Sequence, residues 1–278
     1  MKRILSFLVV IVLTITLVAC SNEQEFDFDR DYIVVGLEAD YEPFNWLETS
    51  PNDYNAKLEG QDAYVAGYDV DIARFIGNEL GLEVRFKQIE WLSLIPALRS
   101  GEIDLIIAGM SPTEERKRTI QFSNYYFMSN HVAVMHKNNP FAEATTLEDL
   151  KNAKGIGQAG TVYEDIINYL GENYGVNVIT SRDDIPEIIQ SITGEVADFT
   201  VVEKPVAENM LAFNEDLIMI LESSAENNIY NVSAEDRELS IGLRKVDNQL
   251  LELVNEALDK VTETMSKGWM EQAQERSK

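Results

Sequence analysis

The residues best suited to chemistry follow an apolar run at positions 103–108. Gly109, Ser111, Thr113 and Arg116 come directly after this run. Its composition is typical of a strand that is covered on both faces, and ligands of open α/β sheets lie beyond the carboxyl ends of such strands. Backbone N–H groups and a guanidinium at this point form a site for a carboxylate. Arginine suits that task better than lysine, because its planar fork of donors matches a carboxylate.

The sequence pattern that precedes these residues recurs later in the chain. Positions 94–108 read as a helix, a Ser-Gly-Glu turn and a strand, and positions 185–202 read as a helix, a Thr-Gly-Glu turn and a strand. Each copy ends in polar residues, which are Gly109 to Ser111 in the first and Glu203 with Lys204 in the second. Two similar lobes that face each other across a cleft would explain both polar ends.

Strand and helix patterns alternate along most of the chain, which predicts an α/β fold with largely parallel sheets. We expect strands at 32–37 and 82–87, and a helix that follows Gly67-Tyr68-Asp69. Thr161 and Glu164 have the spacing of a capping box for another helix. Leu251, Val254, Leu258 and Val261 predict one long closing helix.

The chain begins like an exported lipoprotein. Lys2 and Arg3 precede an apolar run from Ile4 to Ala19, and Cys20 follows. This pattern predicts a signal peptide over residues 1–19 and lipidation of Cys20, the only cysteine of the 278-residue chain. Residues 20–31 are then expected to be a flexible, acidic tether that keeps the protein at the cell membrane, outside the cytoplasm.

The composition narrows the class of protein. The net charge of −25 argues against binding to nucleic acid or anionic lipid. His131 and His136 are the only histidines, and their spacing predicts neither a metal site nor a catalytic triad. No phosphate-binding loop motif is present, so ATP hydrolysis is not expected of this chain. We expect no cofactor and no metal.

Several short motifs share one order and spacing with the family 3 solute-binding proteins, which deliver polar amino acids to ABC importers. The resemblance extends from about Tyr32 to the closing helix. The matching segments are Asp40-Tyr41-Glu42-Pro43-Phe44, Gly67-Tyr68-Asp69-Val70-Asp71, Leu94-Ile95-Pro96-Ala97-Leu98, Ser100-Gly101-Glu102-Ile103-Asp104, Ala108-Gly109-Met110-Ser111 through Arg116, Phe122-Ser123 and Gln158-Ala159-Gly160-Thr161.

The resemblance implies a two-lobed periplasmic-binding-protein fold of type II with two crossover strands at the hinge. Lobe 1 would comprise residues 32–131 and 233–278, and lobe 2 residues 132–232. A monomer would bind a polar L-amino acid between the lobes and deliver it to permease subunits. Residues 52–66 look inserted relative to the family pattern, and a solvent-exposed loop is the default expectation for them.

The resemblance also implies roles for individual residues. Arg116 would bind the ligand's α-carboxylate, and Glu203 would receive its α-ammonium group. The other expected ligand-binding residues are Ala108, Gly109 and Ser111 beside Arg116, Thr161 and Val162 at a helix N-terminus in the second lobe, Tyr41, Phe44 and Trp91 around the side-chain stem, and Glu38 and Gln158 at the side-chain tip.

Simpler interpretations remain open for several of these residues. Core packing suits Phe44, helix capping suits Ser111 and Thr161, and Glu203 could be an acid at a helix start. Asp69, at a position that the family shares, most simply caps its helix.

The ligand and the class of function also have alternatives. Arginine or lysine fits acidic and aromatic candidates, and glutamine fits nearly as well. An enzyme on the same scaffold, similar to a cyclohexadienyl dehydratase, is the main rival to a binding protein. It would need a general acid in the cleft. A sensor input domain is a third possibility.

Overall fold

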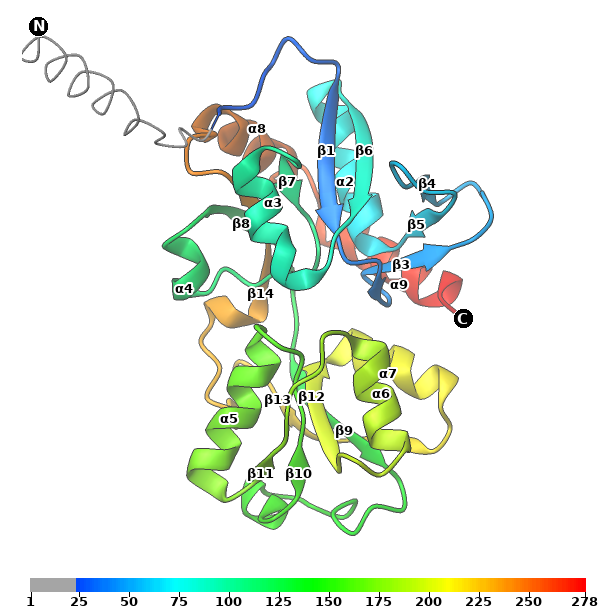
Figure 1. Ribbon diagram of the computed structural model, residues 1–278, viewed down its shortest axis with the longest axis vertical. Helices are drawn as coiled ribbons and strands as arrows, with labels where there is room; N and C mark the ends of the chain where they lie inside the picture. Colours follow the sequence, from blue (N-terminus) through cyan, green and yellow to red (C-terminus); the bar gives the residue numbers. More distant parts are fainter. Residues whose placement is uncertain (1–23) are drawn as a thin grey trace, which may run out of the picture.

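The computed structural model describes residues 24–278, and the expected signal peptide and Cys20 lie outside them. Two five-stranded sheets form the centres of two lobes, one above the other in Figure 1. The upper lobe corresponds to lobe 1 and the lower lobe to lobe 2. The sheet of the upper lobe has the order β6-β1-β7-β14-β8. Its strands are β1 (Tyr32–Leu37), β6 (Glu83–Gln88), β7 (Leu105–Ile106), β8 (Gln121–Met128) and β14 (Glu238–Leu243).

In the upper lobe β1 is parallel to β6 and β7, whereas β14 is antiparallel to β7 and β8. α3 packs against β1 and β7, and α2 lies behind the sheet in Figure 1, in contact with α8 and α9. The helical segments are α2 (Tyr68–Leu80), η1 (Trp91–Ser93), α3 (Leu94–Ser100), α4 (Glu114–Lys117), η3 (Glu235–Arg237), α8 (Asn248–Leu258) and α9 (Glu263–Arg276).

The sheet of the lower lobe has the order β11-β10-β12-β9-β13. Its strands are β9 (His131–His136), β10 (Lys154–Gly155), β11 (Asn177–Val178), β12 (Phe199–Glu203) and β13 (Leu217–Ser223). The helical segments of this lobe are η2 (Leu147–Leu150), α5 (Val162–Tyr174), α6 (Ile185–Thr193) and α7 (Lys204–Phe213). Glu203 is the last residue of β12, and its carboxylate contacts the Tyr41 hydroxyl of the upper lobe.

The chain crosses between the sheets twice. Residues 129–130 join β8 to β9, and residues 224–237 lead from β13 back to β14. The two crossing segments are tied together, because the Ser129 N–H donates to the Arg237 carbonyl oxygen at 3.1 Å. These crossings lie where we propose the lobe boundaries, close to residues 131 and 232.

The segment expected to be a solvent loop is ordered. A third, four-stranded sheet has the order β2-β3-β5-β4, and β4 and β5 lie within residues 52–66. Its strands are β2 (Asp40–Tyr41), β3 (Asn45–Glu48), β4 (Ala56–Lys57) and β5 (Tyr64–Ala66). Arg74 of α2 fixes the segment by donating to the carbonyl oxygens of Tyr54, at 2.5 Å, and Asn55. The inserted residues are therefore a hairpin bound to lobe 1.

Three local expectations differ from the structure. The closing helix is two helices, because α8 ends at Leu258 and α9 starts only at Glu263. The strand expected at 103–108 is only Leu105–Ile106 in β7. The Thr161 side chain accepts from the N–H of Tyr163, and the Glu164 carboxylate accepts from the N–H of Gly160 rather than that of Thr161.

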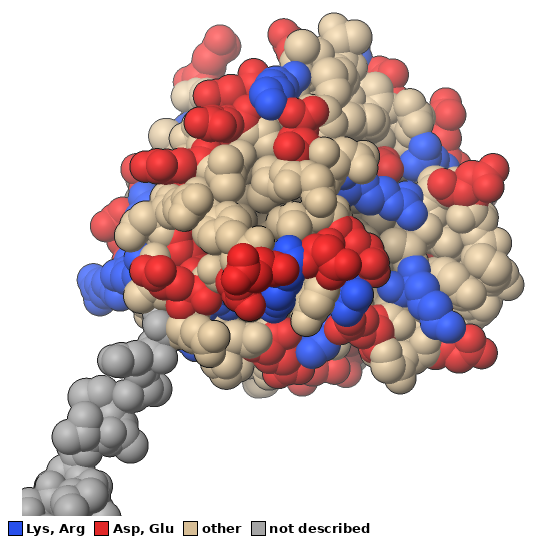
Figure 2. Space-filling view, turned by 90° about the horizontal axis from the view of Figure 1, so that it is seen from above, with Lys and Arg blue, Asp and Glu red and all other residues tan. Residues whose placement is uncertain are grey.

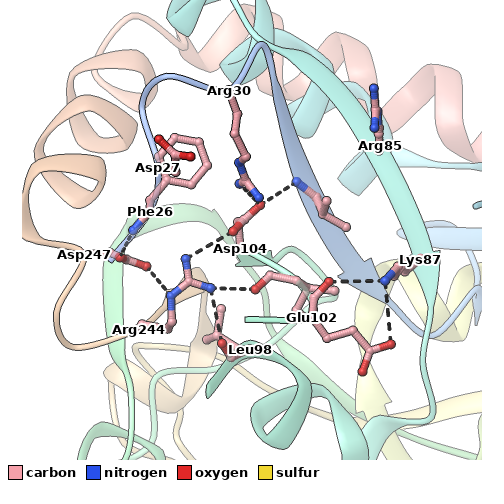
Figure 3. A network of polar contacts seen from close by, with 12 residues as sticks. Phe26, Asp27, Arg30, Arg85, Lys87, Leu98, Glu102, Asp104, Arg244 and Asp247 are labelled. Atoms are coloured by element: carbon pink, nitrogen blue, oxygen red, sulfur yellow. Dashed lines mark hydrogen bonds and ion pairs between the residues drawn. The ribbon is translucent and has the colours of Figure 1, made fainter. Parts of the chain in front are cut away.

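The part of the expected flexible tether that the structure describes is bound to lobe 1. Phe26 is buried, and its N–H donates to Asp247 at 2.8 Å. Arg30 donates to Asp104 at 2.5 Å, beside the buried Arg244, which also pairs with Asp104 at 3.1 Å (Figure 3). Residues 26–30 therefore cannot act as a free linker, because a buried ring and ion pairs hold them.

Acidic side chains are numerous on the face of the molecule that Figure 2 shows. Figure 2 shows many Asp and Glu side chains on the face seen from above, with Lys and Arg between them. No helix in residues 24–278 is long and apolar enough to cross a membrane.

Candidate functional site

The two lobes meet at a small cavity lined from both sides. Its volume is about 20 Å³, room for about one water molecule. The lining residues are Glu38, Tyr41, Trp91, Ala108, Gly109, Ser111 and Arg116 from lobe 1, and Thr161, Val162, Tyr163 and Glu203 from lobe 2. Ten of the twelve expected ligand-binding residues are thus brought together.

Direct contacts between the lobes close this cavity. The Arg116 guanidinium and the Trp91 indole N–H both donate to the Gly160 carbonyl oxygen, at 2.9 and 3.2 Å. On another side, the Gln158 amide donates to both carboxylate oxygens of Glu38 at 3.2 Å. The structure is therefore a closed form, in which lobe 1 side chains already contact lobe 2.

Arg116 is placed by a capped helical turn and an aromatic face. The Thr113 hydroxyl caps α4 by accepting from the Arg116 N–H. The guanidinium also donates to the Ser111 carbonyl oxygen at 2.8 Å and lies 5.0 Å from the centre of the Trp91 ring. Burial lowers its pKa to about 10, so it stays charged at neutral pH. Within residues 24–278 its side-chain acceptors are carbonyl oxygens rather than a carboxylate, which leaves its charge available to an anion.

Glu203 supplies the opposite charge from lobe 2. Its side chain is buried at the end of β12 and accepts from the Tyr41 hydroxyl, which also contacts the Tyr163 hydroxyl. Glu203 occupies the N-cap position of α7, but its side chain forms no capping hydrogen bond. Burial raises the pKa of Glu203 to about 7. Across residues 24–278, no lysine or arginine forms an ion pair with it, so a ligand cation would relieve the cost of its burial.

A second buried carboxylate, that of Glu38, lines the cavity. Glu38 follows β1, and Asp40 lies two residues later. Burial, reinforced by Asp40, raises the pKa of Glu38 to about 8. Burial also raises the pKa of Asp40 to about 7, reinforced by Asp184 of lobe 2 and by Glu90. One Asp40 oxygen is buried without a hydrogen-bond partner among the described residues. Glu38 and Asp40 therefore form an acidic pair whose ionised form is costly on its own and would be stabilised by a cation.

Several polar groups that were expected to bind the ligand form hydrogen bonds within the protein instead. The Gly109 N–H donates to the Tyr126 hydroxyl at 3.0 Å, and the Ser111 hydroxyl donates to the Asp236 carbonyl oxygen at 3.1 Å. The Thr161 hydroxyl donates to the Gln158 carbonyl oxygen at 2.7 Å. The backbone N–H groups at the start of α5, near Thr161 and Val162, remain suited to an anion, because a first helical turn has no internal acceptor for them.

Two expected residues do not line the cavity. Phe44 is fully buried behind Tyr41, with the two rings stacked 5.3 Å apart, so it belongs to the core. Gln158 lies behind Glu38 and holds its carboxylate. Tyr163 is an addition to the lining, and Asp40 acts on the lining residue Glu38 without lining the cavity itself. Tyr163 is the second residue of a capped helix, and Asp40 repeats the acid of Glu38 at strand spacing.

Asp69 does not cap its helix. The N-cap of α2 is Gly67, which offers no side chain, and the Asp69 carboxylate instead accepts from the side chains of Tyr126 and Asn45. Within residues 24–278, no group of histidine, cysteine or acidic side chains has the arrangement of a metal site.

Comparison with known proteins agrees with this geometry. Residues 33–276 match the family described as bacterial extracellular solute-binding proteins, family 3. The arginine-binding extracellular protein ArtP of Bacillus subtilis (strain 168) is 30% identical over 97% of this chain and 98% of its own length. The L-cystine-binding protein TcyJ of Escherichia coli (strain K12) is 28% identical, over 87% and 83% of the two chains.

Solved structures confirm the expected fold. An ancestral arginine-binding protein bound to arginine superposes with a TM-score of 0.69 and 30% identity, covering 89% of this chain and 98% of its own. The arginine-bound substrate-binding protein AbpA of Streptococcus pneumoniae has a TM-score of 0.74 at 23% identity, covering 90% of this chain and 97% of its own. These neighbours have the two-lobed type II periplasmic fold.

Proposed function

This chain belongs to family 3 of the bacterial extracellular solute-binding proteins, and on that premise we propose that it binds an L-amino acid with a cationic side chain, arginine above all. The observation that carries the proposal is the buried carboxylate of Glu38, whose pKa is raised to about 8 by burial and by Asp40. Such a carboxylate is costly unless a cation neutralises it.

The proposed pose has three charged contacts. The ligand's α-carboxylate pairs with Arg116 and receives N–H groups from the start of α5. Its α-ammonium group pairs with Glu203 of lobe 2, which a buried tyrosine hydroxyl holds in place. Its side chain passes Trp91, and the terminal guanidinium or ammonium meets Glu38 and Asp40.

Closure follows from where these charges lie. Arg116 and Glu38 belong to lobe 1, whereas Glu203 and the start of α5 belong to lobe 2. A ligand that pairs with both lobes binds the closed form better than the open one, and it shifts the population by that difference in affinity. In this structure Arg116 and Trp91 contact Gly160 across a cavity with room for about one water molecule, so the lobes must part to admit an amino acid and then close less tightly around it.

The relatives support arginine and keep glutamine as the rival. ArtP is named as an arginine-binding protein. An ancestral arginine-binding protein is also known in a glutamine-bound structure, which is 29% identical to this chain with a TM-score of 0.67. The rivals differ in one charge, and the Glu38 end of the cleft favours the charged side chain.

Isothermal titration calorimetry of the protein, freed of bound amino acids by unfolding and refolding, tests this ligand class. We expect affinity to fall in the order L-arginine, L-lysine, L-glutamine at pH 8. Agmatine, which is arginine without its carboxylate, is the matched control for Arg116 and should bind far more weakly than arginine. Tighter binding of glutamine than of arginine would refute the cationic ligand.

We further propose that the protein is a lipid-anchored, non-catalytic monomer that delivers its ligand to ABC permease subunits. Cys20 directly follows an apolar leader, and family membership supports the importer. Mass spectrometry of the mature N-terminus should show a lipid on Cys20, and Cys20→Ser should release the protein from membranes. Turnover of a cyclic acid by the pure protein would contradict the non-catalytic role.

A further inference from the structure

We propose that Asp69 is a positioning residue for ligand binding, which fixes the two ligand-binding loops of lobe 1 from behind the cavity. It acts through Asn45 on the loop that carries Glu38 and through Tyr126 on the loop that leads to Arg116. The inference rests on the proposed function only in taking this cavity as the amino-acid site.

The centre of the arrangement is a carboxylate with no exposed surface. Asp69 is the second residue of α2 and is fully buried. One of its oxygens accepts from the Tyr126 hydroxyl at 2.8 Å, and the other accepts from the Asn45 side-chain amide at 2.8 Å. Both oxygens accept hydrogen bonds, so the arrangement uses the ionised carboxylate, which prevails above the pKa of about 7 to which burial raises this group. The first turn of a helix favours that charge.

Each partner of Asp69 holds one backbone N–H of a ligand-binding loop. The Asn45 side-chain oxygen accepts from the Ala39 N–H at 2.7 Å. The Tyr126 hydroxyl accepts from the Gly109 N–H at 3.0 Å. Because Asp69 occupies the donor groups of both side chains, it leaves their oxygens oriented toward these two N–H groups.

Both of these loop residues have the left-handed backbone conformation. Ala39 has a φ of 66° and Gly109 has a φ of 62°. This conformation is unfavourable for a residue with a Cβ atom such as Ala39, so the loop needs outside support to keep it. Ala39 directly follows Glu38, so a change in its backbone would turn the Glu38 carboxylate away from the cavity that it lines.

The position of the Gly109 backbone also matters for Tyr41. A Cβ atom at this position would lie 2.7 Å from the Tyr41 ring, so the backbone touches the residue that bonds Glu203. The hydrogen bond from Gly109 to Tyr126 therefore fixes the surface on which Tyr41 lies. Asp69 is connected in this way to both ends of the cleft without lining it.

The test compares two buried tyrosines that stack 6.1 Å apart. Tyr126→Phe removes the hydroxyl that joins Asp69 to Gly109. Tyr68→Phe is the matched control, because the Tyr68 hydroxyl bonds the Tyr126 carbonyl oxygen and Ser266 rather than a ligand-binding loop. We expect Tyr126→Phe to raise the Kd for arginine at least tenfold, whereas Tyr68→Phe leaves it within twofold, although both lower the melting temperature.

Amide hydrogen exchange adds a readout that loss of stability alone would not change. In Tyr126→Phe, the exchange of Gly109 should accelerate more than that of the core strand β1, and in Asp69→Asn both Ala39 and Gly109 should accelerate. Tyr126→Phe keeps the test valid if Asp69→Asn fails to fold. An unchanged Kd in Tyr126→Phe, or an equal rise in both tyrosine variants, would overturn the proposal.

The result is separable from the identity of the ligand. Each variant is compared with the wild type for whichever amino acid the wild type binds most tightly. A wild type that prefers glutamine would refute the cationic ligand and leave the role of Asp69 to be decided by the same ratio of Kd values.

Discussion

Replacement of Glu38 by glutamine gives the sharpest test of charge recognition, because its effect should depend on pH. At pH 9 the Glu38 carboxylate, with a pKa of about 8, is already ionised when arginine arrives. Removal of one partner of a buried charge pair costs about 2–5 kcal/mol, which is a loss of about 30- to 5,000-fold in affinity. Glu38→Gln should therefore weaken arginine binding by that factor at pH 9.

At lower pH the same substitution should cost less. At pH 6 the wild type must first release a proton from Glu38, two units below its pKa, which costs about 2.7 kcal/mol. The wild type should thus lose about 100-fold in arginine affinity between pH 9 and pH 6 through this group. Glu38→Gln has no proton to release there, so its affinity should fall less over this range.

Calorimetry at pH 6, 7, 8 and 9, in pairs of buffers with different ionisation enthalpies, measures both the Kd and the protons released. Glutamine is the control ligand, because its neutral side chain should bind the variant within a fewfold of the wild type. Glu252→Gln is the control variant, because Glu252 of α8 is exposed, solvent screens its charge, and it is not among the groups that raise the pKa of Glu38. Equal pH slopes for wild type and Glu38→Gln would refute the reasoning.

Three further predictions address other parts of the molecule. Arg116→Ala should fold normally but lose about 2–5 kcal/mol of arginine binding free energy, whereas its agmatine affinity should change little. Equal losses for the two ligands, measured by calorimetry, would contradict the assignment of Arg116 to the α-carboxylate. The pKa values of Glu203 and Asp69 are raised to about 7 in the folded protein, so the folded state without ligand binds more protons than the unfolded chain between about pH 4.5 and 7. The free energy of unfolding, measured by urea denaturation, should therefore fall as the pH rises through this range. A free energy that rises with pH would contradict this prediction. Arg30→Met should lower the free energy of unfolding by about 1.5–3 kcal/mol, because it removes a hydrogen bond to the charged Asp104, and a change in the Kd for arginine would show that the N-terminal segment does more than stabilise lobe 1.

The fold was predictable from the sequence because its main elements are locally consistent. β1 is an apolar run with the expected bounds, and α2 begins and ends beside glycines. The sequence does not reveal the interruption between α8 and α9, because the apolar spacing continues through Val261. In the structure, residues 259–262 are not helical and separate the two helices. The hairpin of residues 52–66 was missed because side chains distant in sequence, above all Arg74, hold it in place.

The cavity was predictable to the extent that single residues determine it. Arg116 stands out because it follows a buried strand in a capped turn. Phe44 belongs to the core, which is the alternative that its sequence left open, since an aromatic residue at the same spacing can face a ligand or the core. Asp69 gave no signal of its role, because its partners Asn45 and Tyr126 lie 24 and 57 positions away. Contacts over such separations leave no pattern in a single sequence.

The network behind the cavity and the charges within it explain each other. A carboxylate such as Glu38 can stay buried without a cation only if the backbone that carries it cannot relax toward water. Ala39 is the point at which that relaxation would begin, since its conformation is strained, and the hydrogen bond from its N–H to Asn45 prevents it. Asp69 therefore preserves the electrostatic cost at Glu38, and a cationic ligand removes that cost on binding. Loss of Asp69 should thus weaken arginine binding more than glutamine binding, because only arginine gains from a carboxylate held in place.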